Sequence, residues 1–456
     1  MKQDHEGHQM EEKLDNAVPG MREQGLSGLH TLIIAAAASL SVANIYYAQP
    51  LLDLMAHDLG IPPATIGLIV MLTQVGYGLG LIFIVPIGDL IDRRKLIIVQ
   101  GLLLAIALVI VGAAGTNAIL LAGMGAVGLT AVVAQTLVAQ AAALATPAQR
   151  GRVVGTVTSG IVTGILAARS FAGTIADVSG WRAVYLTSAL ITLVMAIVLI
   201  AILPRQSAKR NTETYTHALL SIPTMFLRER SLLYRGALAL LIFAAFSTFW
   251  TALVLPLSAP PFSYSHTRIG MFGLVGLAGA IAATCAGRLA DRGYGRWTTG
   301  VSLAVLLLSW GLIALLPVSM AVLLVGVVLM DLAVQAVHVT NLSAIVAFNP
   351  QKSSRLIGGY MVFYSVGSAI GAIAATATYS WFGWTGFLSS GPRLVQLPWR
   401  CGSKARYRRG PIKHCASSSA RVNDWFGPTF PLAALRQKRS FATNRTTDEL
   451  LVQRRF

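Results

Sequence analysis

From about residue 31 to residue 380, the chain alternates between long apolar runs and short polar segments. A helix needs roughly 20 residues, each rising about 1.5 Å, to cross the hydrocarbon core of a membrane. The runs are continuous rather than alternating, which favours helices over the strands of a membrane barrel. The pattern predicts eleven membrane-spanning helices, at 31–52, 65–87, 96–114, 118–145, 153–176, 182–203, 235–257, 269–286, 298–316, 320–348 and 356–380.

The second half of the chain repeats the first. Residues 88–95 (GDLIDRRK) and 287–296 (GRLADRGYGR) both read G-x-L-hydrophobic-D-R, and each follows one apolar run and precedes another. Downstream, residues 147–155 align without a gap on residues 350–358, an offset of 203. Internal duplication of a polytopic membrane protein is typical of transporters. The repeat therefore predicts an all-α membrane protein of two pseudo-equivalent helix bundles.

Composition and charge agree with this prediction. Charged residues form 12% of the chain and hydrophobic residues 55%, whereas soluble domains carry about 25% charged residues. Loops on one side hold sixteen Lys and Arg, and the opposite loops hold only Arg182 and Arg268. By the positive-inside rule, the Arg-rich side is cytoplasmic, and the N-terminus lies there too. The basic balance of the body thus reflects topology rather than nucleic-acid binding.

The polarity pattern also predicts five segments. Residues 1–30 carry five Asp and Glu before residue 16, which excludes a signal peptide. The longest polar stretch between spans separates the two copies. The predicted segments are a cytoplasmic N-terminus (1–30), a six-helix bundle (31–203), a cytoplasmic linker (204–234), a five-span bundle (235–386) and a basic tail (387–456).

The tail breaks the repeat. Gly180 and Trp181 align on Gly383 and Trp384 at the same offset of 203, so a twelfth span is expected next, but the sequence becomes polar. Residues 389–456 hold fourteen Lys and Arg against three Asp and Glu, a net of +11. Each Lys or Arg at mid-depth in a membrane costs about 2.5–3.5 kcal/mol. We therefore expect a disordered tail in place of the last span.

Two explanations for the tail compete. One is a real basic tail that lies in the cytoplasm or on the lipid surface. The other is a shifted reading frame, which replaced the last helix by unselected sequence. The change is abrupt and occurs where the repeat demands a helix, which favours the shifted frame. A chain without its twelfth span is then inactive as written.

The paired G-x-L-hydrophobic-D-R loops resemble the signature loop of the major facilitator superfamily, and the resemblance covers about residues 30–386. Residues 44–50 (NIYYAQP) resemble the end of the first helix in bacterial inner-membrane members of its drug:proton antiporter branch. The chain departs from that branch at Met124, near the place of an Arg in span 4, and at Ile165, which replaces a Pro in span 5. The resemblance implies antiport by alternating access in a bacterial inner membrane.

For the repeated loops, the resemblance implies a conformational role beyond anchoring the topology. Their carboxylates are expected beside neighbouring helix ends, where they help to latch the two halves in one state. A carboxylate near a helix N-terminus gains about 0.3–1 kcal/mol, enough to bias a two-state equilibrium. The switch residues are predicted to be Gly88, Asp92, Arg93, Gly287, Asp291 and Arg292.

Ionisable residues inside predicted spans suggest a site, because burying them in a membrane is costly. Asp331, Gln335 and His338 are spaced four and three residues apart, which places them on one helix face. We expect a central cavity lined by Asp331, Gln335, His338, Asn341, Arg169 and Gln135, the last of which the repeat matches to Gln335. Asp331 is the best single candidate for a proton site. His338 is the second candidate for a proton site, because the unperturbed pKa of imidazole is already about 6.5. The alternative is that Asp331 and Arg169 are structural charges, paired together or with other groups.

The chain contains no H-E-x-x-H, C-x-x-C, G-x-x-x-x-G-K-[ST] or G-x-S-x-G motif. We therefore predict no enzyme, no catalytic residues, no metal and no cofactor, with the proton gradient as the energy source. The predicted function is efflux of a small amphipathic compound by a monomer whose partners are the lipid bilayer and the substrate. The alternatives are a non-transporting sensor or scaffold, a membrane-embedded enzyme, and a non-functional frameshifted remnant.

Overall fold

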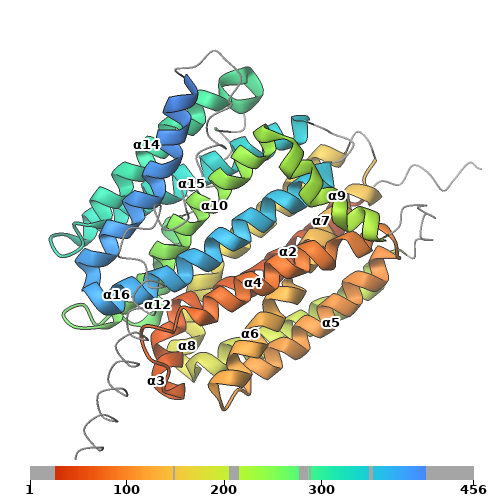
Figure 1. Ribbon diagram of the computed structural model, residues 1–456. Helices are drawn as coiled ribbons and strands as arrows, with labels where there is room; N and C mark the ends of the chain where they lie inside the picture. The colour runs from red at the N-terminus through yellow and green to blue at the C-terminus, as the bar shows by residue number, and fades with distance from the viewer. Residues whose placement is uncertain are drawn as a thin grey trace, which may run out of the picture.

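The computed structural model describes residues 26–146, 149–204, 215–276, 286, 289–348 and 353–406. Every regular element in these ranges is a helix, and the helices form two bundles that lie against each other (Figure 1). The predicted all-α fold of two helix bundles is confirmed.

The first bundle begins where Ser27 caps a helix by accepting a hydrogen bond from the backbone N of His30. Thr116 and Asp92 cap later helices in the same way, so short polar side chains start the helices between apolar runs. The elements are α2 (Gly28–Tyr46), η1 (Gln49–Leu51), α3 (Leu52–Leu59), α4 (Leu68–Phe83), η2 (Val85–Asp89), α5 (Arg93–Gly112), α6 (Asn117–Ala131), α7 (Val133–Leu144) and α8 (Arg150–Ile202).

The second bundle repeats this order of helices. Its elements are α9 (Tyr215–Arg228), α10 (Arg230–Ala252), α11 (Val254–Ser258), α12 (His266–Val275), the short π-helix η3 (Ala290–Tyr294), α14 (Gly295–Ile313), α15 (Met320–Phe348) and α16 (Ser353–Arg406).

Nine helices in the described residues are long and apolar enough to cross a membrane. One of them, α8, has 53 residues and holds the two predicted spans 153–176 and 182–203, separated by a kink at Gly180. The predicted span 269–286 begins in α12, and its residues 277–285 lie outside the described part of the chain. The helices therefore match the apolar runs wherever the structure describes them.

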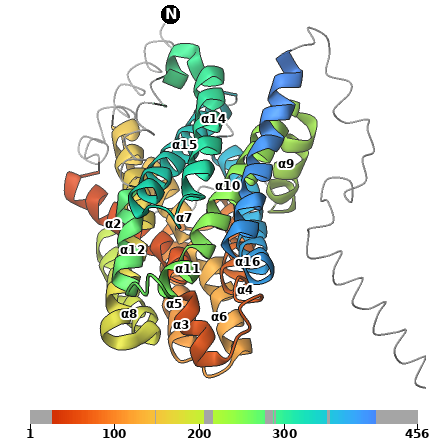
Figure 2. The same ribbon diagram turned by 90° about the vertical axis from the view of Figure 1, so that its left-hand side faces the viewer.

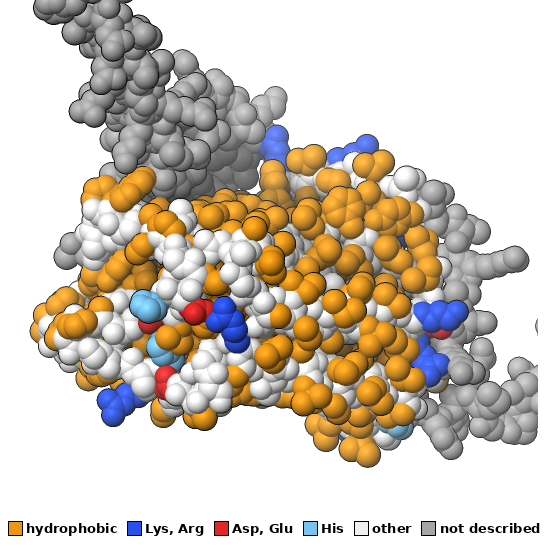
Figure 3. All heavy atoms as spheres, turned by 90° about the horizontal axis from the view of Figure 1, so that it is seen from below, with side chains coloured by type: hydrophobic (Ala, Val, Ile, Leu, Met, Phe, Trp, Pro, Cys, Tyr) orange, Lys and Arg blue, Asp and Glu red, His pale blue; other side chains and the backbone are white. Residues whose placement is uncertain are grey.

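Large hydrophobic side chains cover the outside of both bundles. On α5, Val99, Leu103, Ile106 and Ile110 are exposed at helical spacing. Figure 3 shows one face of the molecule on which hydrophobic side chains form a broad band, with charged side chains toward its two ends. Water-soluble monomers rarely expose apolar patches of this size, so these surfaces face lipid.

The two halves meet mainly through α8 with α12 and through α4 with α16. Glycines permit this close contact, because a Cβ at Gly270 would collide with the backbone O of Arg169, and one at Gly173 with that of His266. Near the start of α8, beside the Arg-rich loop at 150–152, Gly155 has open space beside it. The halves are thus in contact at the end opposite the Arg-rich loops.

A helix occupies the predicted linker 204–234, of which residues 205–214 lie outside the described ranges. In α9, Phe226 packs against Phe363 of α16, with 5.5 Å between ring centroids. Figure 2 shows α9 beside α10 and α16. Tyr215 donates a hydrogen bond of 2.9 Å to the backbone O of Phe83 in α4, so the linker contacts both halves.

The predicted disorder of the tail is wrong for residues 387–406. Helix α16 bends sharply part-way along (Figure 1), at Gly383, and its backbone stays helical to Arg406. Its later part carries Arg393, Arg400 and Lys404. Low hydropathy excludes a membrane span but not a helix, because helical hydrogen bonds form within the backbone itself. Residues 407–456 lie outside the described ranges.

Candidate functional site

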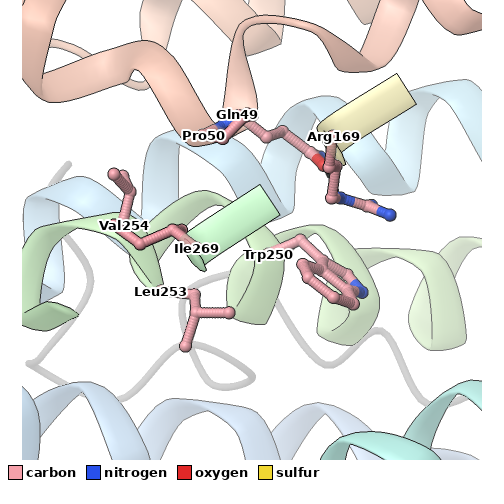
Figure 4. Close-up of a pocket in the computed structure, with 7 residues that line it drawn as sticks. All are labelled: Gln49, Pro50, Arg169, Trp250, Leu253, Val254 and Ile269. Carbon is pink, nitrogen blue, oxygen red and sulfur yellow. Dashed lines mark hydrogen bonds between the residues drawn. The ribbon is translucent and has the colours of Figure 1, made fainter. Parts of the chain in front are cut away.

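Arg169 of α8 lies at the boundary between the two halves with only 1% of its surface exposed. Its Nε donates a hydrogen bond of 2.9 Å to Oε1 of Gln49 in the first half. Its guanidinium lies over the indole of Trp250 in the second half, with Cζ 3.8 Å from the ring centroid (Figure 4). Nη1 and Nη2 of Arg169 have no hydrogen-bond partner among the described residues.

Asp331 of α15 contacts the same indole from the second half. Its side chain is 3% exposed, and its Oδ1 accepts a hydrogen bond of 3.4 Å from Nε1 of Trp250. Its Oδ2 has no hydrogen-bond partner in the described part of the chain. Asp331 and Arg169 form no ion pair with each other within 4.0 Å. The structure brings the two predicted charges to one indole but does not join them.

Aromatic residues enclose the two charges. The hydroxyls of Tyr46 in α2 and Tyr364 in α16 are hydrogen-bonded across the boundary between the halves. The Tyr46 ring lies 5.5 Å from Cζ of Arg169, and the Phe246 ring lies 5.8 Å from it. The guanidinium is therefore surrounded by the faces of three rings, an arrangement that stabilises a cation in a desolvated site.

A small pocket adjoins Arg169 on the boundary between the halves (Figure 4). Its lining combines one cation, one amide and several apolar side chains. The lining residues are Gln49, Pro50, Arg169, Trp250, Leu253, Val254 and Ile269. A few polar groups in an apolar concave surface are typical of a small-molecule site.

The other predicted cavity residues on α15 find partners within the second half. Nδ1 of His338 lies 3.0 Å from the hydroxyl of Tyr360. Oδ1 of Asn341 accepts a hydrogen bond of 3.2 Å from Nη1 of Arg235. Gln335 is half-buried between Asp331 and these two. The predicted polar face thus runs from Asp331 toward the Arg-rich end.

Gln135 lies in the first half, where its Nε2 donates a hydrogen bond of 3.2 Å to the hydroxyl of Tyr77 in α4. None of its recorded hydrogen bonds reaches Arg169 or Asp331. The expectation that Gln135 and Arg169 act on one ligand therefore stays a prediction.

Asp92 and Arg93 of the first repeated loop form hydrogen bonds inside their own half. Asp92 caps α5 by accepting a hydrogen bond of 2.9 Å from the backbone N of Arg94. Nε of Arg93 donates to the backbone O of Gly88 at 2.9 Å, and its Nη1 to that of Ala139 in α7 at 3.5 Å. Asp92 thus lies at a helix N-terminus as expected, but at that of the helix it begins rather than of a neighbouring helix.

The second repeated loop is described only in part. Gly287 lies outside the described residues, Asp291 and Arg292 lie in η3, and Arg292 is exposed. The predicted latch between the halves at these loops stays a prediction.

A polar contact between the halves, which sequence reasoning missed, lies at the opposite end. Nε2 of His266 in α12 lies 3.0 Å from Oδ2 of Asp53 in α3, and its Nδ1 lies 3.2 Å from Oδ1 of Asp177 in α8. Asp177 also accepts hydrogen bonds from the backbone N of His266 and of Thr267, at 3.0 and 2.8 Å. Three polar residues at span ends were the only signal, and no periodicity joins them.

The two carboxylates favour the charged form of His266. Burial opposes protonation of the ring, but the hydrogen bonds and charges of Asp53 and Asp177 outweigh it, so the pKa of His266 is raised. The geometry agrees, because an imidazole with an acceptor at each nitrogen must donate from both. In the described residues, no group of three His, Cys, Asp or Glu is arranged to hold a metal ion.

Comparison with known proteins shows which family has this architecture. The sequence matches the Major Facilitator Superfamily over residues 32–349 and, in a second match, over residues 236–392. The chain belongs to the major facilitator superfamily. The prediction of a multi-pass membrane transport protein is therefore confirmed, while the drug:proton antiporter branch stays a resemblance.

Two similar proteins carry transporter names. The chain is 40% identical to "Uncharacterized transporter YgaY" of Escherichia coli O157:H7 over 370 residues, which cover 81% of this chain and 94% of that protein. It is 32% identical to "Probable transporter SCO4007" of Streptomyces coelicolor, over 80% of this chain and 85% of that one.

A similar solved structure is a bacterial homolog to the human lysosomal transporter Spinster, in an inward-facing and unoccupied conformation. It superposes with a TM-score of 0.69 at 15% identity, over 84% of this chain and 98% of that chain. At this identity the likeness supports the superfamily fold.

Proposed function

We propose that this superfamily member is a proton-coupled secondary transporter that exports a small amphipathic compound by alternating access. The observation that carries the proposal is the site at Trp250, where Arg169 and Asp331 are buried between the halves with three unsatisfied polar atoms. An isolated buried charge costs several kcal/mol. Ionisable groups inside spans therefore mark transport pathways by default.

The contacts between the halves support alternating access. The halves touch through α8 and α12 near the kink of α8, opposite the Arg-rich loops, while Gly155 near the start of α8 has open space. With the Arg-rich loops and the N-terminus in the cytoplasm, this is a conformation closed to the outside. We place the protein in the inner membrane of a bacterium, as a monomer in contact with lipid.

Proton coupling is assigned to Asp331, with His338 as the second candidate on the same face of α15. A carboxylate between two moving halves can load and release a proton as its surroundings alternate. The proton gradient then supplies the energy, and no cofactor is required.

One observation favours a second candidate, an inactive remnant of a frameshifted transporter. Residues 389–406 hold four Lys and Arg, so they form no apolar span, although the repeat requires one there. Without it, faces of neighbouring helices meet lipid where the superfamily fold has protein.

The test is proton flux in proteoliposomes that contain the full chain, with an imposed pH gradient and a panel of amphipathic compounds. We expect compound-dependent proton flux that Asp331→Asn abolishes. Glu229→Gln changes an exposed carboxylate before α10 and serves as the control that leaves the flux intact.

Two results would count against this function. Unchanged flux and pH dependence in Asp331→Asn would remove Asp331 from the mechanism. A folded protein that gives no flux with any compound would favour the remnant, or a sensor or scaffold.

A further inference from the structure

Three polar atoms at the central site have no partner among the described residues, and they have opposite character. Nη1 and Nη2 of Arg169 are donors, and Oδ2 of Asp331 is an acceptor when the carboxyl is ionised. Both side chains are more than nine-tenths buried and contact Trp250. The site therefore offers an anion-binding group and a cation-binding group on one indole.

We propose that the transported compound is a small aromatic zwitterion of amino-acid size, with its carboxylate on Arg169 and its ammonium on Asp331. This inference rests on the proposed function and adds its substrate class. A guanidinium with two free terminal nitrogens binds a carboxylate through two parallel hydrogen bonds. A carboxylate oxygen accepts equally well from an ammonium group.

Charge balance favours a zwitterion over a ligand with a single charge. An anion satisfies Arg169 but is repelled by ionised Asp331. Asp331 then takes up a proton when the anion binds, so that compound and proton move in the same direction. A cation satisfies Asp331 but leaves Arg169 unpaired and is repelled by it. A zwitterion satisfies both groups, and its ammonium excludes the proton from Asp331, as an exchange of compound for proton requires.

Each charged group has its own neighbours. Gly276 packs directly against Oδ2 of Asp331, and a Cβ at this glycine would collide with the oxygen. On the other side, the pocket next to Arg169 presents Leu253, Val254 and Ile269 to an apolar body (Figure 4). The ligand lies between two charges with its ring against apolar side chains.

The proton balance follows from the groups that face Asp331. These are Arg169 from α8 and Trp250 from α10, with His338 further along α15 itself. When the ammonium arrives, protonated Asp331 loses its proton from the carboxyl to water, and the carboxylate pairs with the ammonium. One compound binds and one proton leaves.

Three probes with one scaffold test the charge requirement on the purified full chain. Tryptophan carries a carboxylate and an ammonium, tryptamine only the ammonium, and indole-3-propionate only the carboxylate. We expect tryptophan to bind at least about tenfold more tightly than either analogue, because each analogue leaves one buried charge unpaired. Calorimetry in buffers of different ionisation enthalpy should show proton release with tryptophan.

Variants assign each end of the ligand. Arg169→Gln should remove the preference for tryptophan over tryptamine, and Asp331→Asn the preference over indole-3-propionate. Gly276→Ala should weaken tryptophan binding by displacing Oδ2 of Asp331, whereas Glu229→Gln should bind as the unchanged protein does. Thermal melting of each variant checks that it is folded.

The outcomes separate this inference from the proposed function. Equal binding of tryptophan and one analogue, binding of none of the three probes, or proton uptake with tryptophan would overturn the zwitterion. Proton flux with other compounds in the proteoliposome assay would then leave the transporter intact. Absence of flux with every compound, including tryptophan, would instead remove the transport function itself.

Discussion

The two halves share a backbone plan and differ in chemistry. Gly180 and Gly383 occupy matched positions and both have positive φ, 81° and 62°. The residues that the repeat matches to the two central charges are alanines, however. At the offset of 203, Arg169 matches Ala372, and at the offset of 200 between Gln135 and Gln335, Asp331 matches Ala131. Both alanines are fully buried.

The repeat therefore accounts for the boundary between the halves, but it does not account for the two charged residues of the candidate site at that boundary. Each half contributes one charge from a different helix, α8 in the first and α15 in the second. A symmetric protein would present two like groups to a ligand. The asymmetry allows one face of the site to bind an anion and the other a cation.

The largest expected effect comes from removing the charge of the first half. Arg169→Met keeps apolar contact with Trp250 and should lower transport about 100-fold or more, because a carboxylate loses a charge-assisted bidentate partner. The free energy of unfolding should be unchanged or higher, since an unpaired buried charge is removed. Flux assays and melting in detergent measure the two quantities.

A structural ion pair predicts the opposite for stability. If Arg169 balanced Asp331 in the fold, its loss would cost about 3–5 kcal/mol of unfolding free energy. Arg182→Met is the control, because Arg182 pairs with Asp58 at a partly exposed site.

The two kinks give the next largest effect. Gly180 has φ 81° and ψ 166°, a conformation that only glycine adopts readily, so Gly180→Ala should destabilise the protein by about 1–3 kcal/mol. Gly383→Ala imposes similar strain but should cost less, because the helix after it carries Arg393, Arg400 and Lys404 and so is not an apolar span. Melting temperatures compare the two, with Gly155→Ala, which has open space, as the control. Equal losses at both kinks would show that the helix after Gly383 is packed as firmly as the sixth span.

A smaller effect is expected at the closed end, where His266 of the second half meets Asp53 and Asp177 of the first. The pKa of His266 is raised. Its contribution is therefore fully present below the ordinary pKa of about 6.5 and is lost as pH rises through the raised value. Spin-label distances across this end should show separation of the halves increasing with pH. His266→Asn should remove that dependence, and a variant that keeps it would refute the assignment.

The smallest expected effect compares the matched glutamines. Gln135→Ala loses a hydrogen bond to Tyr77 and should lower the unfolding free energy by about 0.5–1.5 kcal/mol. Gln335→Ala should change it less, because Gln335 is only half-buried. Chemical or thermal denaturation ranks the two variants. A larger loss of unfolding free energy in Gln335→Ala than in Gln135→Ala would contradict this expectation.

Much of the fold was predictable, because membrane spans are selected by average hydropathy and the repeat confirmed their order. Arg169 and Asp331 were predictable as residues of a candidate site, because burying such groups is costly wherever they occur. Trp250 and Gln49 were not, because a neutral aromatic or amide in a span carries no such cost. Their roles depend on contact between helices that are distant in sequence.

The remaining differences have physical causes too. His266, Asp53 and Asp177 come from three separate segments, and only the packing of the halves brings them together. Helix α9 escaped prediction because the average polarity of the linker hid the apolar side of residues such as Phe226. The helix after Gly383 escaped because hydropathy tests for membrane insertion rather than for backbone hydrogen bonding.

Asp177 gives the closed end a further property. It accepts from the first two backbone N–H groups of α12, so a residue of one half completes the helix of the other. When the halves part, those amides exchange a carboxylate for water, a loss of about 0.5–2 kcal/mol. That corresponds to a roughly 2- to 30-fold change in the ratio of closed to open molecules. In the proposed alternating-access cycle, the distribution between the two conformations is thus tied to how well a single aspartate caps a helix it does not belong to.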